Sequence, residues 1–303
     1  MSIYQQISRN KRNTIFFLGV ITLLLVAVVY TIGFILAPET AYMFAIIAFV
    51  IAAVGGFFSY YYSDKALLKM ANARPVSREK EPYLYHTIEG VAIASGIPTP
   101  KAYVIESDVP NAFATGRNPE NSAVAVTRGL MDLLNREELE GVVAHEMAHI
   151  RNYDVLFATI VIVLAGTLVF ISAIVRRSYF FGGARGSSRS GGKSNPVLVI
   201  IGLVLIILAP IAAKITQLAV SRNREYLADA TAAETLGYPL GLASALEKLN
   251  SYNNPEQVKK DGFANDANAG MFIINPLAKN LKADSLFSTH PPIAKRVEAL
   301  KKM

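Results

Sequence analysis

Residues 137–150 read EELEGVVAHEMAHI, and the residues that lead into this stretch predict a helix. Residues four apart share one face of a helix, so the rings of His145 and His149 can reach the same metal ion. Glu146 lies beside them, where its carboxylate can act as a general base on an attacking water. Two of the chain's 4 histidines fall in this one motif. We therefore interpret it as a catalytic metal site rather than as two surface histidines.

The third metal ligand must be a histidine or a carboxylate, because the chain contains no cysteine. A catalytic zinc ion takes three protein ligands and keeps one position open. Residues 222–229 read RNREYLAD and offer Glu225 as that ligand, with Asp229 one helical turn later. Asp229 is expected to accept the ring N–H of a ligating histidine and so to fix its tautomer. Two carboxylates one turn apart more often lie on the solvent-exposed face of a helix. The presence of the 145–149 motif favours the interpretation that Glu225 is a metal ligand.

Four apolar runs dominate the composition, in which 52% of the 303 residues are hydrophobic and only 17% are charged. This composition excludes a disordered chain. Each run has about twenty residues or more, enough for a helix to cross a bilayer core of about 30 Å. The first run is too long for the apolar region of a cleaved signal peptide, so we interpret it as an anchor. The runs cover residues 14–36, 41–61, 155–175 and 197–220.

The runs divide the chain into four segments. Residues 1–61 are a two-span anchor, and 62–154 are a first soluble block that carries the metal helix. Residues 155–220 are a transmembrane hairpin with a loop rich in Gly, Ser and Arg, and 221–303 are a second block with the third ligand. The expected fold is a mainly α membrane protein with four transmembrane helices and an α+β metal-binding domain with a small sheet.

Within the two soluble blocks the pattern of apolar residues predicts several short elements. We expect helices over 81–95, 137–150, 222–236, 240–249 and 292–302. Short strands are expected over 103–106 and 123–127. Residues 182–195 and 251–290 are rich in Gly, Ser, Asn, Asp or Pro, and we expect loops there.

The net charge of +7 comes from residues that flank the apolar runs. Arg9, Lys11 and Arg12 precede the first run without an acidic residue, which places the N-terminus in the cytoplasm by the positive-inside rule. After two spans the metal helix returns to the cytoplasm. In the two soluble blocks acidic and basic residues nearly balance, so we expect no nucleic-acid partner.

The third and fourth runs must both cross the membrane or both stay out of it. His149 precedes the third run and Glu225 follows the fourth, and the two side chains must meet at one ion. We expect both runs to cross, because each is long enough. The loop between them, 176–196, holds five basic residues and no acidic one, which goes against the positive-inside rule if that loop lies outside.

The order and spacing of these features resemble the HtpX family of integral-membrane zinc metalloproteases, relatives of the CAAX-prenyl endopeptidases within the gluzincin group. The resemblance rests on the two N-terminal spans, the 145–149 motif, Glu225-x-x-x-Asp229, and residues 288–292, STHPP. It implies a zincin-like protease domain with one Zn²⁺ per chain, held by His145, His149 and Glu225. It also implies the bacterial cytoplasmic (inner) membrane, with an active site facing the cytoplasm that cleaves misfolded or damaged membrane proteins in quality control and the stress response.

The resemblance adds two further groups of residues. In gluzincins an edge strand upstream of the metal helix holds the substrate backbone, and Asn111, Ala112 and Ala114 match that placement, although the segment also fits an ordinary turn. His290, in the His-Pro-Pro sequence, is a candidate donor to the oxyanion of the reaction or a plain residue at a helix start. The alternative donors are Arg222, Arg224 and Tyr226.

Two other functions compete with this interpretation. A CAAX-prenyl endopeptidase has more membrane spans than the four runs found in this chain. A membrane scaffold with a structural zinc ion requires four ligands, whereas the sequence offers three and an intact Glu146. Both alternatives predict a bilayer as partner, and only the proteases predict polypeptide substrates.

Overall fold

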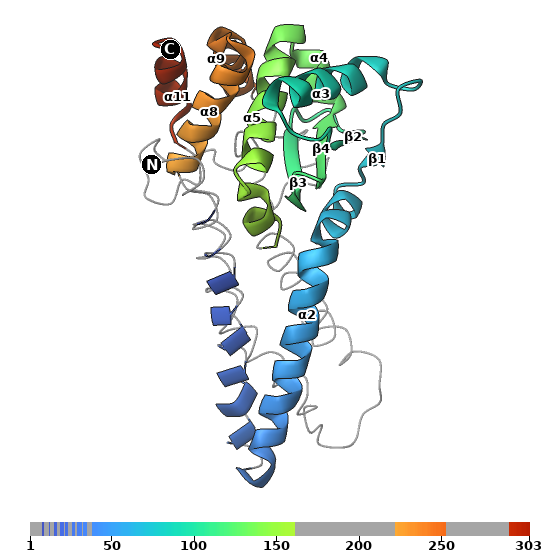
Figure 1. Ribbon diagram of the computed structural model, residues 1–303, viewed down its shortest axis with the longest axis vertical. Coiled ribbons are helices and arrows are strands. Elements are labelled where there is room, and N and C mark those ends of the chain that lie inside the picture. The colour runs from blue at the N-terminus through green and yellow to red at the C-terminus, as the bar shows by residue number, and fades with distance from the viewer. Residues whose placement is uncertain are drawn as a thin grey trace, which may run out of the picture.

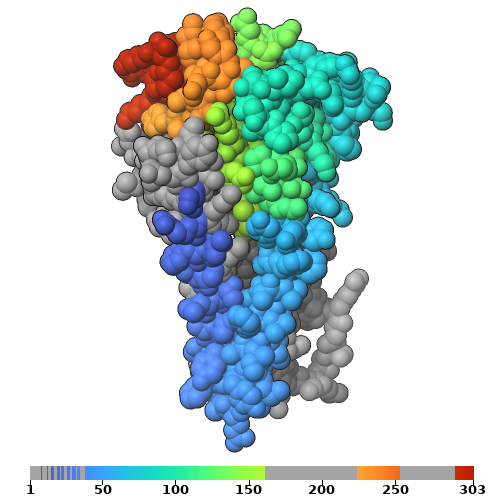
Figure 2. Space-filling model, in the orientation of Figure 1, coloured from blue at the N-terminus to red at the C-terminus, as the bar shows by residue number. Residues whose placement is uncertain are grey.

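The structure is a computed structural model that describes residues 38–160, 222–252 and 291–303, with scattered residues between 8 and 34. One long helix, α2, extends away from a group of shorter helices and a small sheet (Figure 1). In the space-filling view this group forms a broad head, and α2 forms a narrower stalk with the described N-terminal residues beside it (Figure 2). The described chain is thus mostly helical with a small mixed sheet, as expected from the sequence.

The stalk helix α2 (Ala41–Met70) follows one 3-10 turn, η1 (Pro38–Thr40). Large apolar side chains are exposed along its length, among them Phe44, Phe49 and Phe57. Residues 38–70 have a mean hydropathy of 2.3 in their most apolar window, of which 11% is buried, and no other helix in the described part of the chain is long and apolar enough to cross a membrane. An exposed apolar surface of this extent favours a lipid environment.

α2 continues past Tyr61, where we expected the second span to end, as far as Met70. Its last turns bury Leu67 and Leu68 in a small apolar cluster with Phe113 and Ala125 of the sheet. The predicted segment boundary at 61 therefore falls inside a helix. Stalk and head are joined by continuous helix, which fixes their relative position better than a loop would.

The other three predicted spans are only partly described. The described residues of the first run, between 15 and 34, are helical, and the third run is described as far as Ile160. The fourth run, the loop at 182–195 and nearly all of the predicted loop at 251–290 lie outside the described residues. Four membrane spans therefore remain a prediction.

The head contains one four-stranded sheet in the order β1-β2-β4-β3. Its strands are β1 (Arg74–Pro75), β2 (Lys101–Ile105), β3 (Ala112–Asn118) and β4 (Asn121–Thr127). β2 and β4 are parallel and the other pairs antiparallel. Gly116 of β3 has a φ of 141°, and a Cβ there would lie 2.4 Å from the Asn121 carbonyl oxygen, so only glycine fits the β3–β4 hairpin. Among the described strands β3 forms one edge of the sheet.

The helices of the head agree with those expected from the sequence, whereas α4 and the short strand β1 were not predicted, and β3 was expected only from the family resemblance. The helices are α3 (Pro82–Ser95), α4 (Arg128–Leu133), α5 (Arg136–Arg151), α8 (Arg222–Leu236), α9 (Pro239–Ser251) and α11 (Ile293–Leu300). α3 and α9 each have a proline in the first turn, where its missing N–H costs nothing. α3 ends at Gly96, whose φ of 66° is the left-handed conformation that closes many helices.

α5 is the central helix of the head, between α3 and β3 on one side and α8 and α9 on the other (Figure 1). It starts with a capping box, in which Asn135 and Glu138 each accept the backbone N–H of the other. Gly141 allows α9 to approach closely, since a Cβ there would lie 2.7 Å from the backbone nitrogen of Leu242. With most of its surface buried, α5 is a rigid support for side chains that project from it.

The chain bends sharply between α5 and the third apolar run. Tyr153 has a φ of 58°, in the left-handed region that few non-glycine residues adopt. Helical residues resume at Asp154, and the hydroxyl of Thr159 is 3.0 Å from that of Thr115 on β3. The first residues of the third run are thus packed against the sheet rather than exposed.

Candidate metal centre

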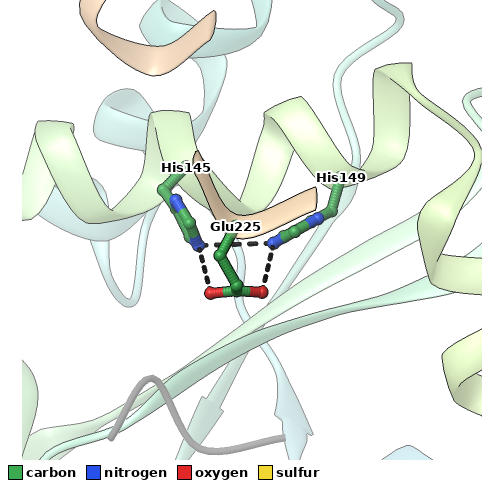
Figure 3. Close-up of side chains that lie close together, drawn as sticks. All are labelled: His145, His149 and Glu225. Carbon is green, nitrogen blue, oxygen red and sulfur yellow. Dashed lines mark hydrogen bonds and ion pairs between the residues drawn. The ribbon is translucent and has the colours of Figure 1, made fainter. Parts of the chain in front are cut away.

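Three side chains from two helices converge at one point of the head. His145 and His149 project from α5, and Glu225 projects from the first turn of α8 (Figure 3). Their nearest donor atoms form a small triangle: 3.3 Å between the two Nε2 atoms, 3.7 Å from His145 Nε2 to Glu225 Oε2, and 3.6 Å from His149 Nε2 to Glu225 Oε1. The predicted ligand set is therefore assembled by the fold, across a gap of about 75 residues in the sequence.

The triangle fits a zinc ion. Zn–N and Zn–O bonds of about 2.0–2.2 Å in a tetrahedral site place neighbouring ligand atoms roughly 3.3–3.5 Å apart. The three measured separations lie at or slightly above that range, and two imidazoles with one carboxylate are donors that zinc accepts.

His145 is held from behind by Asp229. The Nδ1 atom of His145 is 3.0 Å from Asp229 Oδ1, on the ring edge opposite the triangle. Asp229 in turn receives two hydrogen bonds from Arg296 of α11, Nε to Oδ2 at 2.8 Å and Nη2 to Oδ1 at 2.7 Å. Burial opposes ionisation of Asp229, but the hydrogen bonds from His145 and Arg296 outweigh it and lower its pKa. An ionised Asp229 accepts the Nδ1–H of His145, which leaves Nε2 with a free lone pair toward the triangle.

His149 has a corresponding partner in Asp154, just after the bend at Tyr153. His149 Nδ1 and Asp154 Oδ2 are 3.3 Å apart, and Arg224 Nη1 is 3.8 Å from the other oxygen of Asp154. Burial lowers the pKa of His149, but Asp154 and the charge of Glu225 overcome this and raise it to about 9. Each histidine thus has one nitrogen at the triangle and the other beside a carboxylate, the arrangement that orients metal-ligating histidines.

Glu146 lies beside the triangle on the side of the sheet. Its Oε2 accepts a hydrogen bond of 2.8 Å from the backbone N–H of Ala114 on β3. Burial raises the pKa of Glu146 above its ordinary value, against the lowering effect of His145 and His149. A carboxylate held in place, with its proton affinity raised, suits a general base that must take and release a proton near neutral pH.

The residues expected to bind substrate lie on or next to β3, and their backbone groups face two ways. Asn111 is paired inward: its N–H donates to Thr127 Oγ1 at 2.8 Å, and its carbonyl accepts the N–H of Thr127 at 2.9 Å. In an antiparallel pair the next residues alternate, so Ala112 and Ala114 direct their backbone groups to the opposite edge. The outward backbone N–H of Ala114 is already bonded to Glu146, so its carbonyl is the group left for a substrate. Substrate binding by Asn111, Ala112 and Ala114 stays a prediction.

The residues proposed as oxyanion donors are only partly described by the structure. His290 and the side chain of Arg222 lie outside the described residues, so their proposed roles as oxyanion donors remain predictions. Arg224 lies beside Asp154. His86 lies on α3, contacts Glu89 and is not one of the three side chains of the triangle.

Two residues of the centre were not found from the sequence. Asp154 is five residues beyond the motif, across a bend that no local pattern predicts. Arg296 shares helical spacing with Ile293, Val297 and Leu300, the apolar stripe of α11. An arginine inside an apolar stripe was a usable signal of a buried charge, because such a residue is buried only when it is paired.

Metal affinity is expected to depend strongly on pH, because a metal must displace the proton of His149. With a pKa of about 9 the ring is protonated at neutral pH in the metal-free protein, so the apparent association constant for Zn²⁺ should fall about tenfold for each pH unit from 8 to 6. Competition with a chelator of known pH dependence measures it. In Asp154→Asn, which removes the partner that raises this pKa, the dependence should flatten. An affinity that is constant between pH 6 and 8 in the unsubstituted protein would contradict the assignment of His149.

Comparison with known proteins gives consistent matches over most of the chain. The model of peptidase family M48 matches residues 78–303. A protease HtpX homolog of Dictyoglomus turgidum is 43% identical over 302 residues, covering 100% of this chain and 95% of its own. The homolog of Thermococcus sibiricus is 46% identical and covers 94% of both chains, and that of Streptococcus gordonii is 41% identical and covers 99% and 100%. Among solved structures, S. mikatae Ste24p aligns with a TM-score of 0.49 at 21% identity, over 89% of this chain and 64% of its own.

Proposed function

Because the chain belongs to peptidase family M48, and within it to the HtpX proteases, we propose that it is a membrane-bound zinc-dependent endopeptidase that cleaves polypeptides next to the bilayer. Family membership makes the chain a metalloprotease that acts on polypeptides. The observation that carries the finer proposal is the triangle of His145, His149 and Glu225 with Glu146 beside it.

Each residue of the centre has a distinct task in this proposal. His145, His149 and Glu225 hold the zinc ion, with Asp229 and Asp154 behind the two rings. A zinc ion held there polarises the substrate carbonyl and makes water more acidic. Glu146 takes the proton from the attacking water and passes it to the leaving amine, while the Ala114 N–H keeps the carboxylate in position.

The edge of β3 is proposed to hold the substrate. An extended chain that pairs with this edge, at Ala112 and at the carbonyl of Ala114, would lie directly beside Glu146, to which the Ala114 N–H stays bonded. Pairing of this kind uses main-chain hydrogen bonds and requires an extended segment, so a folded helix or domain cannot enter. This selects locally unfolded segments and supports a role in removing misfolded or damaged proteins.

The position of β3 relative to α2 supports cleavage close to the membrane. Near the head, α2 exposes a group of aromatic side chains of the kind that gathers at a membrane–water interface: Phe57, Phe58, Tyr60, Tyr61 and Tyr62. The guanidinium of Arg117 on β3 lies 4.9 Å from the centre of the Tyr61 ring. Arg117 follows Ala114 by three residues along the strand, a rise of about 10 Å. The base Glu146 would then be about 10 Å from the interface along the edge strand.

We propose that the active site faces the cytoplasm, on the basis of the basic residues before the first apolar run. In this arrangement residues 1–61 anchor the chain, the blocks 62–154 and 221–303 build the protease domain, and 155–220 form a transmembrane hairpin between them. A bacterial inner membrane is the location we propose, although the relatives include an archaeal protein as well as bacterial ones.

A pair of single-span test proteins tests both location and side. We expect rapid cleavage when an unfolded segment directly follows the membrane span on the cytoplasmic side, and cleavage slower by about tenfold or more when a folded domain separates the same segment from the span. Fragment mass spectrometry after co-expression identifies the cut, with Glu146→Gln as the inactive control. Equal cleavage of both proteins would contradict the proposal that cleavage takes place close to the bilayer. Cleavage only of a segment on the opposite side would reverse the orientation.

A further inference from the structure

Arg296 is the largest fully buried side chain of the head, with 0% of its surface exposed. It comes from α11, the last helix of the chain, and it reaches the metal centre from the side opposite the sheet. Its Nε and Nη2 atoms form the two hydrogen bonds to Asp229. Its Nη1 is 3.3 Å from Glu225 Oε2, and its Nη2 is 3.5 Å from both ring nitrogens of His145.

We propose that Arg296 is a positioning residue for the metal centre, and that α11 is thereby part of that centre. Arg296 holds His145 through Asp229, and it holds Glu225 directly. The inference rests on the zinc centre proposed above. It adds that zinc binding also depends on Arg296, which is neither a ligand nor one of the carboxylates beside the histidine rings.

The geometry explains why the side chain is an arginine. One planar guanidinium faces two carboxylates at once, with a fork on Asp229 and the remaining amino group toward Glu225. Lysine has one compact ammonium group and cannot keep both sets of contacts in fixed directions. The two carboxylates lie one turn apart on α8, and His145, which Asp229 contacts, lies on α5. Arg296 therefore fixes the register of α8 against α5 at the metal.

A comparison with Arg224 shows what is particular to Arg296. Arg224 stands behind the other histidine in a similar way, but its Nη1 is 3.8 Å from Asp154 and its side chain is partly exposed. Such a pair contributes little in water. Arg296 is fully enclosed and forked, so its loss leaves Asp229 and Glu225 without their common partner inside the protein.

The test compares metal binding by full-length variants in detergent. We expect Arg296→Met, which keeps the length of the side chain, to bind Zn²⁺ about 10–100-fold more weakly in chelator competition. The visible absorption bands of bound Co²⁺, which report ligand geometry without any turnover, should shift. The matched control is Lys301→Met, which removes an exposed ion pair with Glu247 at the end of the same helix. Its affinity and spectrum should equal those of the unsubstituted protein.

A coupled substitution separates positioning from general support of the fold. If Arg296 acts through Asp229, the loss of affinity in Arg296→Met with Asp229→Asn should be smaller than the product of the two single losses. Should Arg296→Met fail to fold, Arg296→Lys carries the same test, because it keeps the charge and loses the fork, and it should bind at least several-fold more weakly.

Three outcomes are distinguishable. Affinity within twofold of the unsubstituted protein in a folded Arg296→Met, or in Arg296→Lys where only that variant folds, overturns the positioning role and leaves the zinc centre intact. An unsubstituted protein that binds no metal overturns the centre itself. Weak binding in the Arg296 variants with normal binding in Lys301→Met supports the inference.

Discussion

Glu146→Gln is expected to abolish peptide cleavage while the protein keeps its metal. The amide cannot take a proton, so the rate of cleavage should fall by at least about a thousandfold, within the range for loss of a general base. The amide oxygen can still accept the Ala114 N–H, which holds the side chain in place. Metal affinity should stay within a few-fold of the unsubstituted protein, because Glu146 is not one of the three donors. Cleavage of an unfolded membrane protein and metal content, measured on the same preparation, check both parts.

The matched control is Glu140→Gln on the same helix. Glu140 forms an i,i+4 ion pair with the exposed Arg136 and precedes His145 by five residues on α5. Its loss should leave cleavage unchanged, since exposed pairs of this kind contribute only tenths of a kcal/mol. Residual activity of Glu146→Gln near that of the unsubstituted protein would mean that another group takes the proton, and the mechanism would have to be abandoned.

His145→Ala is expected to lose the metal, and all cleavage with it. His145 is one of three donors and is held at Nδ1 by Asp229, so its removal leaves two ligands in an open site. Bound zinc should fall from about one ion per chain to below about 0.1 at concentrations that saturate the unsubstituted protein. Stabilisation by added zinc, about 4 kcal/mol when the free metal is a thousandfold above Kd, should also disappear.

Two further variants make the result decisive. His86→Ala, on the exposed surface of α3, removes a histidine of the head outside the centre and should bind zinc normally. Glu225→Gln keeps the shape of the third donor and should weaken binding without leaving a cavity. A zinc content near one in folded His145→Ala would contradict the ligand assignment, and normal zinc affinity in Glu225→Gln would contradict the third ligand.

Local features of the sequence were enough to predict much of the fold. The spacing of His145 and His149 is a property of one helix, and a helix fixes the relative direction of residues four apart wherever it packs. The helix over 81–95 was predicted to end before Gly96, because glycine readily adopts the left-handed conformation that closes a helix. The helix expected over 240–249 is α9. The second apolar run was predicted as a helix because about twenty apolar residues are enough for a helix to cross the core of a bilayer. Its true end at Met70 was missed because the last turns are polar outside and pack on the sheet.

The sequence by itself gave the metal-binding motif, the carboxylate proposed as general base, the carboxylate proposed as third ligand and the apolar character of the stalk, because each follows from composition or from spacing within one element. Only the tertiary structure decided that Glu225 meets both rings, that Asp154 returns to His149 across a left-handed bend, and that Arg296 closes the centre from the last helix. It also decided that the backbone N–H of Ala114 on β3 reaches the carboxylate of Glu146. These features depend on contacts between residues up to 151 positions apart, as between His145 and Arg296, and such contacts are fixed by the packing of helices and strands rather than by any local pattern.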